Sequence, residues 1–192
     1  SVIASDGNPT RVEIDEFPLD GDLRYFATPA INSEAYTTVR IADWSGHKFM
    51  DGKAQVIADN SYLGSFPLEL PVIGDTMVIS LGSTPHVLCS RELSEELSKS
   101  TFLSRKKVTS TWILKVENAL HDSISVDLID ALPQSSTRDG DIEIEVSASN
   151  SGEIDLINHL VTYSLELAPG ERREVSLTIS VTYPRRSILR GL

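Results

Sequence analysis

The residues that could support nucleophilic catalysis are few. Cys89 is the one cysteine of the chain, and His86 precedes it by three residues, so an imidazole could activate the thiol. The segment has the pattern of a strand, however, and residues three apart on a strand point to opposite faces of the sheet. The sequence also lacks the Gly-x-Ser-x-Gly elbow of a serine hydrolase. These observations predict that the protein is not an enzyme.

Acidic turns are the main candidates for metal binding. Asp139 and Asp141, with Glu143 as a third oxygen donor, resemble part of a calcium-binding loop, but the remaining EF-hand ligands are absent. Asp-Gly is also an ordinary hairpin signal. The four histidines show no zinc spacing, and a lone cysteine excludes a cysteine-rich zinc site. We therefore predict neither a metal nor another cofactor.

A small basic island offers a candidate interaction site. Arg105, Lys106 and Lys107 follow Phe102 and Leu103, so an apolar anchor would lie inside a charged rim, as at the centre of many protein interfaces. The alternative without a binding function is a solvated hairpin arm, whose lysines protect an edge strand from pairing with other chains. Both interpretations stay open, and these five residues form the predicted interaction arm.

The elements that must position these residues are strands. Apolar residues alternate with serine and threonine through Val175, Leu177, Ile179, Val181 and Tyr183, which predicts a strand with one buried and one solvated face. Shorter runs of the same kind recur along the chain, separated by turn signals such as Asp51-Gly52 and Pro169-Gly170. This spacing predicts an all-β protein, an antiparallel immunoglobulin-like β-sandwich.

Two halves of the chain share a pattern. In each half, apolar residues lie five and seven positions after a turn glycine: Ile79 and Leu81 after Gly74, Val175 and Leu177 after Gly170. We predict two lobes in tandem, with an N-terminal β lobe at 1–90 and a C-terminal immunoglobulin-like sandwich lobe at 108–192. Residues 91–107 would form a linker or projecting hairpin arm, in which propensity alone would allow one helical turn.

The balance of acidic and basic residues limits the classes of molecule that the chain is expected to bind. Asp and Glu number 28 against 17 Lys and Arg, a formal net charge of -11. Such a surface repels phosphate backbones, so nucleic acid is an unfavourable partner. No apolar run approaches the length of a membrane-spanning helix. The expected partners are therefore proteins, including a second copy of the chain.

Several short motifs, in order, resemble those of the mucoidy inhibitor A family. They are Leu23-Arg24-Tyr25-Phe26-Ala27-Thr28-Pro29-Ala30, Ala35-Tyr36-Thr37-Thr38-Val39-Arg40-Ile41, Ser61-Tyr62-Leu63-Gly64, Asp130-Ala131-Leu132-Pro133, Leu167-Ala168-Pro169-Gly170-Glu171 and Val181-Thr182-Tyr183-Pro184. The resemblance covers residues 1–192 and implies a C-terminal domain of unknown function. It also implies a further β domain and a coiled coil on its N-terminal side in the family's members, and no catalytic residues.

These observations favour a non-catalytic binding or scaffold domain that mediates protein–protein interaction or self-association. The alternative is a carbohydrate-binding β-sandwich module, with calcium assistance from Asp139 and Asp141. Exposed aromatic side chains would support that alternative. Trp44 and Trp112 are predicted to be core residues instead, because Trp112 alternates with a strand face.

Overall fold

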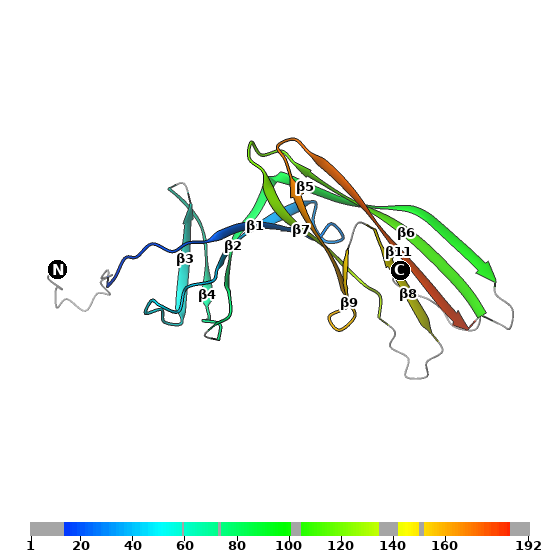
Figure 1. Ribbon diagram of the computed structural model, residues 1–192, viewed down its shortest axis with the longest axis horizontal. Helices are drawn as coiled ribbons and strands as arrows, with labels where there is room; N and C mark the ends of the chain where they lie inside the picture. Colours follow the sequence, from blue (N-terminus) through cyan, green and yellow to red (C-terminus); the bar gives the residue numbers. More distant parts are fainter. Residues whose placement is uncertain are drawn as a thin grey trace.

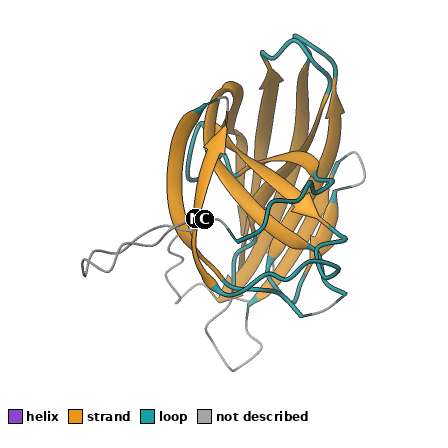
Figure 2. Ribbon diagram, turned by 90° about the vertical axis from the view of Figure 1, so that its left-hand side faces the viewer, coloured by secondary structure: helices purple, strands orange, loops and turns teal. Residues whose placement is uncertain are grey.

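The computed structural model describes residues 14–58, 60–72, 74–100, 105–134, 142–149 and 152–184. These residues form strands joined by turns and contain no helix, as Figure 2 shows. The strands are β1 (Asp22–Ala27), β2 (Glu34–Ile41), β3 (Gly52–Ala58), β4 (Ser61–Leu68), β5 (Met77–Ser100), β6 (Arg105–Asn118), β7 (Ile124–Ala131), β8 (Glu143–Ala148), β9 (Glu153–Asp155), β10 (Leu160–Leu167) and β11 (Arg172–Pro184). The predicted all-β class is confirmed. No helix within the described ranges is long and apolar enough to cross a membrane.

One large sheet contains most of the strands. Its nine strands follow the order β8-β11-β6-β5-β2-β1-β7-β10-β9, while β3 and β4 form a separate two-stranded sheet (Figure 1). All neighbours in the large sheet are antiparallel except β1 and β7, which pair in parallel from Tyr25–Val126 to Ala27–Leu128. The prediction of a purely antiparallel arrangement is therefore wrong at this one pair. Alternation of side chains reports which face is buried and carries no information about strand direction.

The longest strands have one apolar and one polar face. Strand β11 pairs with β6 from Arg172–Glu117 to Pro184–Arg105, and β6 pairs with β5 on its other side. The inner face of β11 carries the five apolar residues of the alternating run at 175–183, all of them buried. On the outer face, Thr109 and Ser180 are hydrogen-bonded at 2.8 Å. The alternation predicted for β11 is thus confirmed.

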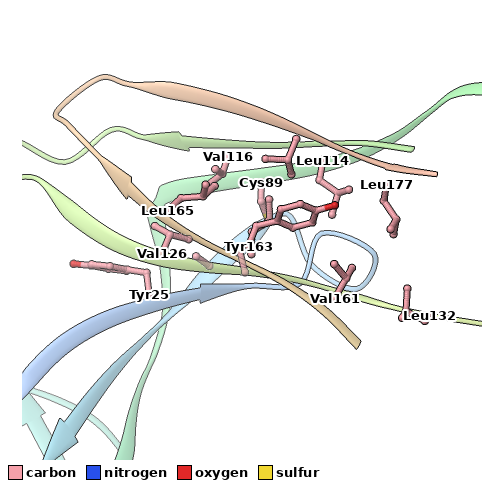
Figure 3. Close-up of a cluster of buried hydrophobic side chains, with 14 of the residues drawn as sticks. Tyr25, Cys89, Leu114, Val116, Val126, Leu132, Val161, Tyr163, Leu165 and Leu177 are labelled. Carbon is pink, nitrogen blue, oxygen red and sulfur yellow. The ribbon is translucent and has the colours of Figure 1, made fainter. Parts of the chain in front are cut away.

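The large sheet curls so that its two halves face each other around one core. Inner residues of β5, β6 and β11 share this core with inner residues of β7 and β10. Figure 3 shows Tyr163 of β10 pointing toward β6, which carries Leu114 and Val116, while Val126 lies on the neighbouring strand β7. The Tyr163 hydroxyl donates to the Ser176 carbonyl of β11 at 2.9 Å, although β10 and β11 are not neighbours in the sheet.

The predicted arm lies within the two longest strands. Residues 91–100 continue β5, residues 105–107 begin β6, and the two segments pair in antiparallel fashion. The single helical turn that propensity allowed does not form here, because β5 extends through the segment, with a bulge between Leu93 and Glu95. The nine-stranded sheet continues across position 90, and the division into two lobes stays a prediction.

A second, smaller core supports the β3–β4 hairpin. Ile41, Trp44 and Met77 are buried there, and Leu68 at the end of β4 packs against them together with Phe49. The indole Nε1 of Trp44 donates to the Asp75 carbonyl at 2.8 Å, which satisfies its one polar group. The predicted core role of Trp44 is confirmed. Figure 1 places the hairpin at the end of the molecule away from β6, β8 and β11.

Candidate functional site

A buried ion pair joins the facing halves of the large sheet. The Nε of Arg91 on β5 donates to Oδ2 of Asp130 on β7 at 2.7 Å. Strands β5 and β7 are separated in the sheet by β2 and β1, so the pair crosses the interior rather than linking neighbours. The guanidinium carbon of Arg91 also lies 3.5 Å from the ring centroid of Trp112, a cation–π contact.

The strand pattern explains why a carboxylate lies inside. Alternation along β7 directs Ile124, Val126, Leu128 and then Asp130 to the inner face, and the Asp130 side chain is 1 % exposed. A buried carboxylate is costly unless it is paired and hydrogen-bonded. Arg91 neutralises it, and the backbone N–H of Ala131 donates to Oδ1 at 2.9 Å. Sequence reasoning missed this pair, and the available signal was an acidic residue at an inward position of β7.

Tyr163 lies near the same cluster and is held tightly. Burial, with a smaller contribution from the Asp130 charge, raises the pKa of the Tyr163 phenol to about 12. Gly152 approaches the ring so closely that an added Cβ would lie 2.5 Å from Cε1 of Tyr163. The phenol, the guanidinium and the carboxylate all have protein partners. The arrangement therefore stabilises the fold and offers no free nucleophile or base among these three groups.

The possible Cys–His pair does not form a reactive dyad. Cys89 is buried, and its Sγ donates to the Asn32 carbonyl at 3.2 Å, while His86 is exposed. Burial raises the pKa of the Cys89 thiol to about 11, so the thiol stays protonated at neutral pH. The opposite orientations agree with the strand pattern. The absence of enzymatic activity itself stays a prediction.

The basic island is only partly described. Phe102 and Leu103 lie outside the described residues. Nη1 of Arg105 lies 3.0 Å from Oε1 of Glu143, and Nζ of Lys107 lies 2.6 Å from Oε2 of Glu145, so two of the cations are countered by carboxylates of β8. Lys106 is in register with Tyr183 on β11. The role of this arm in interaction stays a prediction.

The candidates for metal and sugar binding receive no support. Asp139 and Asp141 fall outside the described ranges, and no group of three or more metal-ligating side chains occurs in the rest of the described chain. One face of Trp112 is covered by Arg91, and Trp44 is buried. Among the aromatic residues that are described, Tyr62 alone is exposed, so no aromatic row is present there.

A pocket on the outer face of β5, β6 and β11 has a volume of about 310 Å³. Its charged lining residues are all paired: Arg172 Nε lies 2.9 Å from Glu117 Oε2, Lys115 Nζ lies 3.8 Å from Glu174 Oε1, and Arg173 pairs with Glu171 beside the pocket. Lys115 is also 2.8 Å from Glu92. Exposed ion pairs of this kind are common on the surfaces of sheets, and they do not select a ligand.

The tip of the β3–β4 hairpin is an exposed apolar feature that sequence reasoning missed. Ile57, Tyr62 and Leu63 are 66 %, 60 % and 49 % exposed. Ile57 and Tyr62 are direct cross-strand partners, and the adjacent irregularity in register places Leu63 at the same tip. Asn60 closes the turn with φ of 60°, a left-handed conformation that asparagine tolerates. Apolar residues on both sides of a short turn were the available signal.

The fold and these surfaces define an all-β domain with a large mixed sheet and an exposed hairpin. A family model described as a domain of unknown function (DUF4139) matches residues 1–185, and the chain belongs to this family. No curated protein matches the chain, and no solved structure matches it. The expectation of a domain of unknown function is confirmed, while the link to the mucoidy inhibitor A family stays a prediction.

Proposed function

We propose that this domain is a non-catalytic binding or scaffold domain that binds another protein. The observation that carries the proposal is the exposed apolar tip of the hairpin, formed by Ile57, Tyr62 and Leu63. Exposed apolar side chains gathered in one region are typical of protein interaction sites, whereas scattered ones are ordinary.

The chemistry of the tip favours a protein partner. Tyrosine is enriched in protein interfaces, where lysine and glutamate are depleted. Tyr62 presents a flat ring with a polar hydroxyl, and Ile57 lies opposite it on the neighbouring strand. The base of the hairpin packs through Leu68 against the core of Ile41, Trp44 and Met77, which positions that end of the hairpin. A positioned apolar surface of this kind loses little conformational entropy on binding.

The non-catalytic part of the proposal rests on satisfied polar groups. Arg91 and Asp130 neutralise each other inside the sheet, and Cys89 is a buried, protonated thiol. A catalytic site needs a free nucleophile, acid or base within reach of a substrate. We also propose that the domain is an immunoglobulin-like two-lobed sandwich, with which the facing halves of the sheet are compatible. We propose as well that it is related to the mucoidy inhibitor A family, which its sequence motifs resemble.

Capture of a partner followed by a binding measurement tests the function. The chain would be immobilised, captured proteins identified, and each one purified and titrated against the free chain by interferometry. We expect at least one protein to bind saturably, with affinity reduced at least tenfold by the paired changes Ile57→Ser and Tyr62→Ser. If every captured protein binds without saturation, or if the pure chain shows turnover abolished by one carboxylate substitution, the proposal is wrong.

A further inference from the structure

The β3–β4 hairpin is a sheet with two open edges. In the part of the chain that the structure describes, neither strand pairs with a third. An isolated two-stranded hairpin is only marginally stable in water, and a third strand adds both hydrogen bonds and apolar contact. Proteins with open strand edges commonly bind extended segments by strand addition. The hairpin therefore has the geometry of an acceptor for a further strand.

The two edges are not equivalent. Strand β4 contains Pro67, which lacks an N–H, and prolines within sheets are placed on edge strands with the nitrogen toward the open side. The open edge of β4 is thus interrupted. Strand β3 runs from Gly52 to Ala58 without a proline, so no missing N–H interrupts the alternate backbone groups that face away from β4. An incoming strand would pair with β3.

The faces of the hairpin define the pattern of side chains that fits. On one face, Ala54 and Val56 of β3 lie beside Phe66 and Leu68 of β4, and all four are half-buried. The opposite face carries Lys53 and Gln55 of β3, whose partners on β4 are Pro67 and Ser65. An added strand with apolar residues at every second position would continue this apolar face across a third strand, where its side chains would pack beside Ala54 and Val56.

The charges at the base of the hairpin select one end of the incoming strand. Asp51 immediately precedes β3, and its Oδ1 accepts a hydrogen bond from the Leu70 N–H at 2.9 Å. Asp43, Glu69 and Asp75 are also exposed in the neighbouring segments, so carboxylates outnumber the two exposed lysines of this region, Lys48 and Lys53, and the whole chain has a net charge of -11. Complementarity calls for basic residues at the end of the partner strand that meets Asp51.

We propose that β3 accepts an extended polypeptide segment of a protein partner, apolar at alternate positions and basic at one end, as a third strand of the hairpin sheet. This inference rests on the proposed function and specifies its surface and the chemistry of its partner. The tip residues Ile57 and Tyr62 would contact the same partner beyond the added strand, because Ile57 belongs to β3 itself.

A labelled peptide of alternating valine and threonine ending in two lysines is the probe, measured by fluorescence anisotropy. Two further peptides carry backbone N-methyl groups on alternate residues, offset by one position. Only alternate N–H groups of an added strand point to its neighbour. We therefore expect saturable binding of the parent peptide, loss of at least tenfold in affinity for one methylated peptide, and near-unchanged affinity for the other. Equal behaviour of both methylated peptides, or no binding of the parent peptide, overturns the proposal.

Protein variants locate the binding edge. Asp51→Asn keeps the acceptor for Leu70 while removing the charge, and should weaken binding severalfold at low salt. The paired changes Leu156→Ser and Ile157→Ser, at residues that are 68 % and 90 % exposed on the β9–β10 turn, are the matched control and should leave binding unchanged. If the control pair weakens binding as much as Ile57→Ser with Tyr62→Ser, the assignment to the hairpin is wrong.

Two other outcomes separate this inference from the proposed function. If a captured protein binds saturably but the peptide does not, strand addition is wrong and the binding function stands. If neither binds, both proposals are wrong. Sedimentation of the chain alone tests whether a second copy of the chain binds to the hairpin. If the chain forms a dimer, and the paired changes Ile57→Ser and Tyr62→Ser dissociate it, the surface belongs to self-association and the proposal is overturned.

Discussion

Replacing Arg91 by methionine should destabilise the domain strongly. The substitution keeps a long apolar stem but leaves Asp130, whose side chain is 1 % exposed, as a buried carboxylate without its cation. Breaking a buried pair in this way costs about 3–5 kcal/mol. Arg91 itself is 19 % exposed, so solvent reaches that end of the pair and the lower part of this range is expected. The lost stacking on Trp112 is contained within the same estimate.

The expected change in unfolding temperature follows from the length of the chain. At about 2.1 cal/mol/K per residue, a two-state unfolding of this chain has an entropy near 0.4 kcal/mol/K, so a loss of about 3–4 kcal/mol should lower the midpoint by about 7–10 °C. Thermal unfolding followed by circular dichroism measures this shift, and guanidinium titration gives the free energy of unfolding independently.

A double-mutant cycle separates the ion pair from general damage. Changing both partners, Arg91→Met with Asp130→Leu, removes both charges and should recover most of the stability lost in the single variant. Lys115→Met breaks ion pairs to Glu92 and Glu174 on the exposed face and should leave the midpoint almost unchanged. If Arg91→Met unfolds within about 2 °C of the parent chain, Arg91 does not stabilise the buried carboxylate, and the reasoning is refuted.

Three further substitutions or titrations test the interior. Gly152→Ala places a Cβ 2.5 Å from Cε1 of Tyr163 and should cost about 1–3 kcal/mol by chemical denaturation, whereas Gly46→Ala, with nothing within 4 Å of the new Cβ, should cost far less. The Cys89 thiol should react with a disulfide reagent at pH 8 much more slowly in the folded chain than in the unfolded chain, and equal reaction rates would contradict its burial. Folding raises the pKa of this thiol from 9.0 to about 11. The contribution of the protonated thiol to the free energy of unfolding is therefore complete below pH 9 and is lost as the pH rises toward 11. Asn118 is fully buried, and its Nδ2 amino group shares its two hydrogens among three backbone carbonyl oxygens that lie 2.9, 3.1 and 3.2 Å away. Asn118→Ala should therefore lower the free energy of unfolding by at least about 2 kcal/mol, and a neutral result would show that these bonds contribute little.

The candidate site was less predictable than the strands that form it. Asp130 could have been recognised as an acidic residue at an inward position, but its partner Arg91 lies 39 residues earlier in the chain. Nothing in the local pattern around Arg91 selects Asp130 among the many carboxylates of an acidic chain. The hairpin tip was missed for a related reason, since apolar residues beside a turn look the same whether or not another element covers them.

Local side-chain alternation by itself determined the all-β class and the buried face of β11 and β7. On a strand the side-chain period is two, so the spacing of Val175, Leu177 and Ile179 is sufficient to define one apolar face. Only the tertiary structure decided that β1 pairs with β7 in parallel, that the sheet curls to bring Arg91 onto Asp130, and that the β3–β4 hairpin stands outside the large sheet. These features depend on contacts between residues distant in the chain, whose energies are set by the packing of the whole sheet rather than by any one segment.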